Sequence, residues 1–532
     1  MASGRMPPGG AGTRRPVCRA SRHGLPVSYP THDSARRLDP AEMTRKLRPY
    51  DQPPRRKRTL IPSAPDSAAG LFLVVAILWL LAAAGLGILA VGTRLFPDLL
   101  KVSFSVPLGS GIEVDITRTT IDPAFVDALV FGWLTNAAFA AIFFVTPRLT
   151  GTRLKSDAVA NMGLAAWNLA LAAGITLLYV KGASGLGSLA EFPLPVKGLA
   201  VLGLVAVNGA FWRTMLPIRE LPYVSFLYFG ISLLALLGLF ALSAIPGVIS
   251  LGSTNDQLLW AFTARGIVTY WVLGSTLGAL YYVIPRVTRN PLYSGGLAFL
   301  GFFGWLAFAG LSAIGALVDP SVPYVITSLG QAGTLLLLAP TFLALANLLA
   351  TMSGRWSLIF SPGTIQFAVA GVAFLFVTAM LESVGALRSV QRLTAGTDWG
   401  LGVLVLGLFG GSTLAFYAFA DHALPRILRR AWSEGFLVHG QLWTAFAGAA
   451  LAGFAMIGGG LVQGSLLAQG GTPDQLNLTL LAFRAAAAAG LSLIALGGFT
   501  LLVNVFLLYT EGRPAEYAVP SVDAASAAVA GR

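Results

Sequence analysis

Asp127, Arg265 and Glu382 are ionisable residues that lie inside long apolar stretches of this chain. Arg265 lies about seven residues inside its stretch, which corresponds to a depth of roughly 10 Å at the 1.5 Å rise of a helix. A charge at such a depth in a membrane costs several kcal/mol unless it is paired or hydrated. We therefore expect Arg265 either to pair with an acid as a structural plug, which we favour, or to form a substrate or ion site.

Residues that bind transition metals are scarce. The single cysteine, Cys18, excludes an intrachain disulfide framework and any cysteine-based zinc or iron–sulfur site. The four histidines are His23, His32, His422 and His439, so residues 33–421 contain none. A metal centre in the middle of the chain would therefore have to do without imidazole.

The elements that position these residues are long apolar segments. The chain has 532 residues, of which 55% are hydrophobic and only 11% are charged, whereas soluble domains carry about 25% charged residues. Apolar runs near 20 residues, the length that crosses a hydrocarbon core of about 30 Å, recur along the sequence. We predict an all-α polytopic membrane protein with twelve spans, near 69–92, 123–146, 157–180, 196–216, 222–246, 258–284, 295–317, 322–351, 363–386, 400–424, 437–463 and 478–509.

The termini differ from the apolar region. Residues 1–66 hold fourteen Arg or Lys against five Asp or Glu, and they are rich in Pro, Gly and Ser. We predict a disordered basic cytoplasmic tail at 1–67, a membrane domain at 68–511 and a short disordered tail at 512–532. A nucleic-acid-binding arm is the alternative for the basic tail. We favour a segment that sets topology and contacts anionic headgroups, with no nucleic-acid partner.

Loop charges predict the orientation. With the N-terminus inside, the inner loops carry eleven Arg or Lys and the outer loops carry seven, so both termini should be cytoplasmic. Four inward-ending spans close on proline followed at once or one residue later by arginine, at Pro147, Pro217, Pro285 and Pro425. We expect each proline to stop its helix, and each arginine to complement the negative end of the helix dipole.

Several short motifs occur in a fixed order. They are FGWL at 131–134, FVTPRLTG at 144–151, RELPYV at 219–224, YYVIPR at 281–286, NPLYS at 290–294, LAP at 338–340, TDW at 397–399 and HALPR at 422–426. Their order and spacing resemble subunit I of the haem–copper oxidases, closest to the cbb3-type enzymes and the nitric oxide reductase large subunit. The resemblance covers roughly 69–510 and implies a twelve-helix bundle of the subunit I type.

The resemblance also implies which positions should hold cofactors. Members of that family bind haem b, a high-spin haem and copper through six histidines, and their second, sixth, ninth and tenth spans crowd the metal centres. Here the corresponding places hold Phe125, Arg265, Val403 and Val405, and the seventh span has no histidine. Haem and copper sites of this kind need imidazole ligands. We therefore expect no cofactor, no metal and no catalytic residue, and we expect Arg265 to pair with Asp127 or Glu382.

Two functions follow from this reading. The first is a subunit I-like protein that has lost its metal ligands and is no longer an oxidase. It would be a structural or assembly subunit, or a paralogue, tied to a respiratory chain in a bacterial plasma membrane, with other respiratory subunits as partners. The second is a transporter or an ion or proton pathway that reuses the same scaffold, with Arg265 in the former metal pocket.

Overall fold

The computed structural model describes residues 65–96, 102–106, 112–181, 192–218, 223–249, 251–317, 321–361, 363–432 and 435–515. Most of the two predicted tails, 1–67 and 512–532, lies outside these ranges. The helices run from Ser67 to Thr510.

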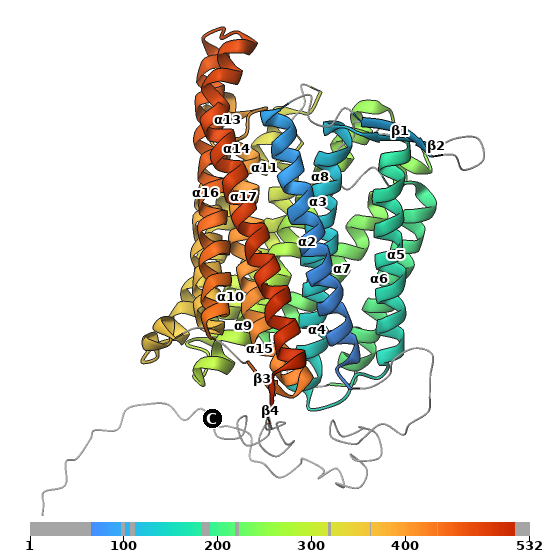
Figure 1. Cartoon of the computed structure of the whole chain (residues 1–532), viewed down its shortest axis with the longest axis vertical. Helices are drawn as coiled ribbons and strands as arrows, with labels where there is room; N and C mark the ends of the chain where they lie inside the picture. The colour runs from blue at the N-terminus through green and yellow to red at the C-terminus, as the bar shows by residue number, and fades with distance from the viewer. Residues whose placement is uncertain are drawn as a thin grey trace, which may run out of the picture. The chain divides into compact units, whose positions relative to one another are not determined.

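Twelve helical segments in the described ranges are long and apolar enough to cross a membrane, which confirms the predicted number (Figure 1). Nine are plain helices: α2 (Ser67–Leu95), α5 (Asp157–Lys181), α6 (Leu194–Met215), α7 (Val224–Leu242), α10 (Gly295–Ile314), α11 (Tyr324–Thr351), α12 (Thr364–Gly385), α16 (Gly435–Ala468) and α17 (Pro473–Thr510). The other three are composite: α3 (Arg118–Asp127) with η1 (Ala128–Leu134) and α4 (Thr135–Thr150), α8 (Ser253–Gly266) with η3 (Ile267–Val272) and α9 (Leu273–Thr288), and α14 (Trp399–Val405) with η5 (Leu406–Thr413) and α15 (Leu414–Leu428).

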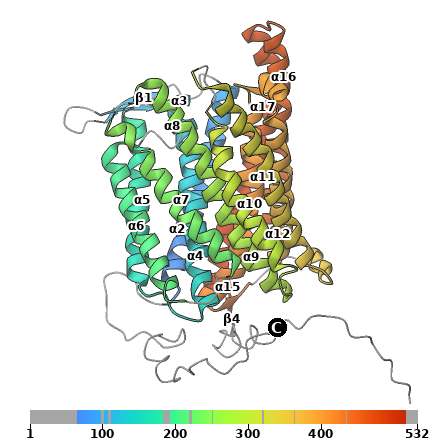
Figure 2. The same cartoon turned by 180° about the vertical axis from the view of Figure 1, so that it is seen from behind.

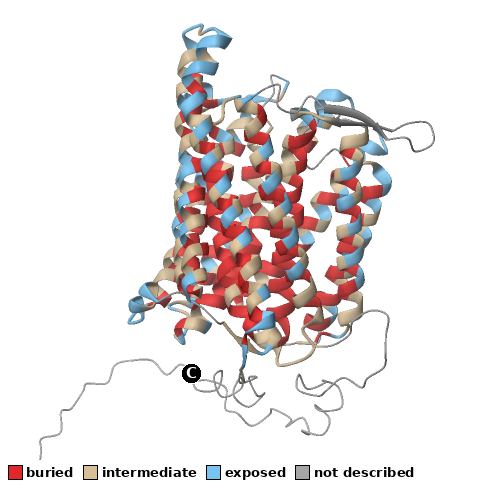
Figure 3. Ribbon diagram, viewed as in Figure 1, coloured by how far each residue is buried: buried red, intermediate tan, exposed pale blue. Residues whose placement is uncertain are grey.

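The three composite spans form the centre of the bundle. Their most apolar windows are 100%, 83% and 89% buried, whereas the other nine spans reach between 33% and 56%. Figure 3 shows this contrast, with continuous buried ribbon inside and mixed colours on the outer helices. The outer helices therefore present apolar side chains to lipid, and the central spans present theirs to one another.

Each central span contains a π-helical stretch, which is rare in proteins and often marks a functional site. In two of them a threonine hydroxyl donates to the carbonyl five residues earlier: Thr135 Oγ1 to Val130 O, and Thr413 Oγ1 to Leu408 O, both at 2.8 Å. Hydrogen bonds also join the stretches. Trp271 Nε1 donates to Thr135 Oγ1 at 2.8 Å, and Trp133 Nε1 donates to Thr413 Oγ1 at 2.9 Å.

The prediction that proline stops the inward-ending helices is wrong at three of four places. The helices α4, α9 and α15 continue for three residues past Pro147, Pro285 and Pro425. They end instead at residues with left-handed backbone, Gly151 (φ 65°), Arg289 (φ 55°) and Arg429 (φ 54°). A proline in the last turn removes only one helical hydrogen bond, so the helix survives it. Only α6, which ends at Met215, stops before its proline.

The two ends of the bundle carry different accessory elements. At one end lie the first residues of α2 and the last of α17: Asp66 pairs with Arg148 at 2.8 Å, and β3 (Arg430–Ala431) pairs with β4 (Arg513–Pro514). At the other end β1 (Val102–Val106) and β2 (Ile112–Ile116) form an antiparallel hairpin, with Val102 opposite Ile116. Both pairs are visible in Figure 1. The first end is the one predicted to be cytoplasmic.

Candidate functional site

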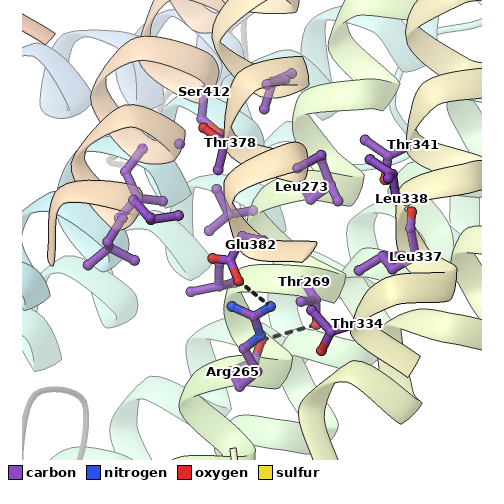
Figure 4. A pocket seen from close by; sticks show the side chains of 18 residues that line it. Arg265, Thr269, Leu273, Thr334, Leu337, Leu338, Thr341, Thr378, Glu382 and Ser412 are labelled. Atoms are coloured by element: carbon purple, nitrogen blue, oxygen red, sulfur yellow. Dashed lines mark hydrogen bonds and ion pairs between the residues drawn. The ribbon is translucent and has the colours of Figure 1, made fainter. Parts of the chain in front are cut away.

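A cavity of about 90 Å³ lies between four of the spans (Figure 4). Its walls come from α8 and η3, from α11, from α12, and from α14 and η5. Most lining side chains are aliphatic, but Arg265 and Glu382 face each other at one end. The cavity has room for a few water molecules or a small ligand.

Arg265 lies in the last turn of α8, and its Nη2 is 2.7 Å from Glu382 Oε2, near the end of α12. The same Nη2 donates to Ser312 Oγ of α10 at 3.2 Å, and Ser312 shares a hydrogen bond of 3.1 Å with Thr334 of α11. The side chains of Arg265 and Glu382 are 22% and 30% exposed. The pair is therefore largely withdrawn from the surface, and hydroxyl groups extend it across two further helices.

Asp127, the other acid predicted to reach Arg265, does not line this cavity. It is the last residue of α3 and is fully buried. The structure thus brings together two of the three ionisable residues singled out from the sequence. Which acid meets Arg265 depends on how the helices are rotated, and that rotation changes at each π-helical stretch.

Five hydroxyl-bearing residues stand among the aliphatic side chains of the cavity wall, and the sequence analysis did not single them out. Thr269 Oγ1 donates to Arg265 O at 3.0 Å, and Thr341 Oγ1 donates to Leu337 O at 2.9 Å. Thr378 Oγ1 is buried without a hydrogen-bond partner among the described residues, and Ser412 lies near it in Figure 4. A buried hydroxyl without a protein partner commonly binds water or a ligand.

Phe125, at the position on the second span that the sequence resemblance assigns to a haem ligand, lies in a different environment. Its ring stacks on Phe409 of η5, with centroids 6.1 Å apart and an angle of 17°. It also fills the space beside Gly87 of α2, where an added Cβ would lie 2.9 Å from Phe125 Cε2. Side chains therefore occupy this part of the bundle. Val403 lines the cavity, whereas Val405 is buried outside it.

A family model supports the fold independently. The model for cytochrome c and quinol oxidase polypeptide I matches residues 67–489. The chain belongs to this family. The match covers the stretch in which the sequence motifs resembled haem–copper oxidase subunit I, so the predicted family is confirmed.

Relatives within the oxidase polypeptide I family have low sequence identity to this chain but align with it over much of its length. The chain is 23% identical over 472 residues to the cbb3-type cytochrome c oxidase subunit CcoN1 of Stutzerimonas stutzeri, covering 86% of this chain and 97% of the relative. It is 24% identical over 357 residues to cytochrome c oxidase subunit 1 of Rhodobacter capsulatus, covering 64% of this chain and 66% of the relative.

A solved structure has the same fold. The chain matches the cryo-EM structure of a heme-copper terminal oxidase dimer with a TM-score of 0.66 at 17% identity, covering 85% of this chain and 86% of that chain. The predicted twelve-helix bundle is thus confirmed.

The residues present do not fit the family's haem and copper groups. The positions that the sequence resemblance assigns to the ligands offer a benzene ring, a guanidinium and two isopropyl groups, none of which is a ligand for iron or copper. No group of three or more His, Cys, Asp or Glu side chains that could hold a metal occurs within the described ranges. His422 lies 19 residues after Val403, roughly 28 Å along the helix, with its ring against Phe144 and Tyr282.

Proposed function

We propose that this protein is an oxidase polypeptide I homologue that binds neither haem nor copper and has no oxidase activity. It serves as a structural or assembly subunit, or as a paralogue, of a respiratory chain. The observation that carries the proposal is the Arg265–Glu382 pair, with Nη2 2.7 Å from Oε2, in the place where the family carries a metal-binding histidine. A guanidinium has no lone pair to offer a metal ion, so Arg265 cannot act as the ligand that the resemblance places at this position.

The ion pair supports a structural role in its own right. Arg265 on the sixth span contacts Glu382 on the ninth and Ser312 on the seventh, so one side chain links three helices. Removing either charge would leave the other largely desolvated, which is costly. The pair therefore holds together helices that a cofactor would otherwise join.

A second function rests on the unfilled space beside the pair. The cavity, with its threonine hydroxyls, resembles part of a polar pathway, and this favours an ion or proton path built on the same scaffold. The π-helical stretch that follows Arg265 is a local irregularity of the kind that often marks a functional site.

The relatives are named as cytochrome c oxidase subunits of bacteria, and we extend this context to the present chain. We place the protein in a bacterial plasma membrane with both termini in the cytoplasm, because its basic residues are concentrated at that end. Its partners would be other membrane subunits of a respiratory complex.

The test is the absorption spectrum and metal content of the purified full chain. We expect no Soret band and less than a tenth of an equivalent of iron or copper. The cbb3-type CcoN1 relative, expressed and purified in the same way, is the control for cofactor supply. A stoichiometric Soret band in this chain would overturn the proposal. Co-purification with respiratory subunits supports the first function, and ion flux in reconstituted vesicles supports the second.

A further inference from the structure

Exposed arginines gather at the end of the bundle where α9 and α11 finish. Arg286 and Arg289 lie at the end of α9, and Arg355 follows α11. All three are exposed, and none forms an ion pair with any residue in the described ranges. The two connections, 289–294 and 352–363, contain no aspartate or glutamate. These arginines therefore have no acidic partner on their own two connections, and the acid beside the second connection is Asp421 of α15, at Gly363.

Hydrogen bonds hold the two connections together. Asn290 Nδ2 donates to Thr351 O and to Ser353 O, both at 2.9 Å. The backbone N–H of Tyr293 donates to Thr351 Oγ1 at 3.1 Å. Arg289 and Arg355 thus belong to one surface, and their spacing is set by backbone contacts. The connection after α11 appears in yellow and gold at the lower right of Figure 2.

Large aromatic side chains lie on the same connections. Trp356 and Phe360 are the first and last residues of the short helix η4 (Trp356–Phe360), and they are 46% and 86% exposed. Tyr293 on the neighbouring connection is 65% exposed. Tryptophan and tyrosine concentrate at the headgroup level of membranes, where an apolar ring and a polar edge are both accommodated.

We propose that Arg286, Arg289, Arg355, Trp356 and Phe360 form a binding site for an anionic phospholipid. The guanidinium groups would donate to the headgroup phosphate, and the aromatic rings would lie against the upper part of the acyl chains. The occupant is a lipid because the surface lies at the end of two membrane-spanning helices. It is an anionic lipid because the three charges lack an acid. Asp421, on α15, accepts a hydrogen bond of 2.5 Å from Thr364 Oγ1 through its Oδ2.

The experiment measures lipid binding to the purified, delipidated full chain by native mass spectrometry. Phosphatidylglycerol is the anionic probe, phosphatidylcholine the zwitterionic probe and inorganic phosphate the competitor. The test variant is Arg286→Gln/Arg289→Asn/Arg355→Gln. Asparagine is chosen at position 289 because it tolerates the left-handed backbone there (φ 55°). The control is Arg213→Gln, which removes an exposed arginine from the last turn of α6.

We expect the wild-type protein to bind phosphatidylglycerol at least about tenfold more tightly than phosphatidylcholine. The triple variant should bind phosphatidylglycerol about 100-fold more weakly, because each arginine near the surface contributes about 1 kcal/mol, which is roughly a factor of five. Arg213→Gln should change the affinity by less than about twofold. Equal affinities of the wild-type protein and the triple variant for phosphatidylglycerol would overturn the proposal.

Three further measurements separate the sources of the effect. Trp356→Ala/Phe360→Ala should weaken binding of both lipids, while the preference for the anionic one remains. Full displacement of phosphatidylglycerol by millimolar inorganic phosphate would identify a site for a free anion and overturn the lipid assignment. The triple variant should also unfold at the same temperature as the wild-type protein in neutral detergent. This would show that weaker binding does not come from a damaged fold.

Discussion

Two regions of the bundle, both at positions that the sequence resemblance assigns to cofactor ligands, differ in their packing. Around Phe125 apolar groups are in contact: the ring stacks on Phe409 and packs against Gly87. Around Arg265 a cavity of about 90 Å³ remains, with an ion pair at one end and an unpartnered hydroxyl in its wall. Apolar side chains can fill a vacated space by packing alone. A cavity with largely buried charges costs free energy, so we infer that the Arg265 region is retained for a reason beyond packing.

The frame shared by the two regions is the set of three π-helical stretches. Trp133 of η1 donates to Thr413 of η5, and Trp271 of η3 donates to Thr135 at the end of η1. All four side chains are at most 1% exposed. Because buried hydrogen bonds of this kind fix the helices relative to one another, the two regions can diverge without disturbing the centre of the bundle.

The largest expected effect tests whether the Arg265–Glu382 pair holds the bundle together. Arg265→Leu and Glu382→Leu should each lower the free energy of unfolding by about 3 kcal/mol, because each leaves a largely desolvated charge without its partner. The double variant should cost less than the sum of the two. Unfolding in mixed micelles titrated with SDS measures all three. Strict additivity would show that the two charges act independently, and Arg392→Leu, an exposed site on α13 (Arg388–Thr394), serves as the control.

A somewhat smaller effect tests whether packing around Phe125 stabilises the bundle. Phe125→Ala should lower the free energy of unfolding by about 2 kcal/mol, since it removes the stack on Phe409 and opens a void beside Gly87. Phe125→Leu should cost less than half as much, because it keeps most of the apolar volume. The same SDS titration measures both. If Phe125→Ala unfolds like the wild-type protein, the region is not filled by packing and the contrast with the Arg265 cavity disappears.

An effect of about 1 kcal/mol tests the frame that joins the regions. Thr413→Val keeps the shape of the side chain but leaves Trp133 Nε1 buried without an acceptor. Trp133→Phe removes the donor instead, and the double variant should be milder than the sum of the two. Thermal unfolding in detergent provides the measurement. Additive losses would mean that this hydrogen bond does not couple η1 to η5.

The smallest effect concerns the hydroxyl in the wall of the cavity. Thr378→Val should change the free energy of unfolding by less than about 0.5 kcal/mol, because Thr378 Oγ1 has no hydrogen-bond partner to lose among the residues that the structure describes. The matched variant is Thr334→Val, whose hydroxyl bonds Ser312 and Gly330 O, and it should cost about 1 kcal/mol. A loss of 1 kcal/mol or more at Thr378 would indicate a water or ligand bound to its hydroxyl, which would favour the polar pathway.

The number of spans was predictable from the sequence for a simple physical reason, whereas the family was predictable from the order of its short motifs. The thickness of the hydrocarbon core sets the length of each apolar run, and that length can be read along the chain without knowledge of neighbours. The absence of histidine between residues 33 and 421 is equally a property of the chain alone. Helix ends were less predictable because they depend on backbone conformation. Three helices continue past the prolines that were expected to stop them.

The sequence by itself determined that Arg265 lies within a membrane span and must find a partner. Only the tertiary structure decided that the partner is Glu382 and that Asp127 is buried elsewhere. The sequence does not distinguish between two acids at similar depths in their spans. The rotation and packing of the helices decide which of them faces Arg265. The π-helical stretches after Asp127 and Arg265 each shift the facing of the helix by an inserted residue, and such a shift depends on contacts between helices that the linear pattern does not contain.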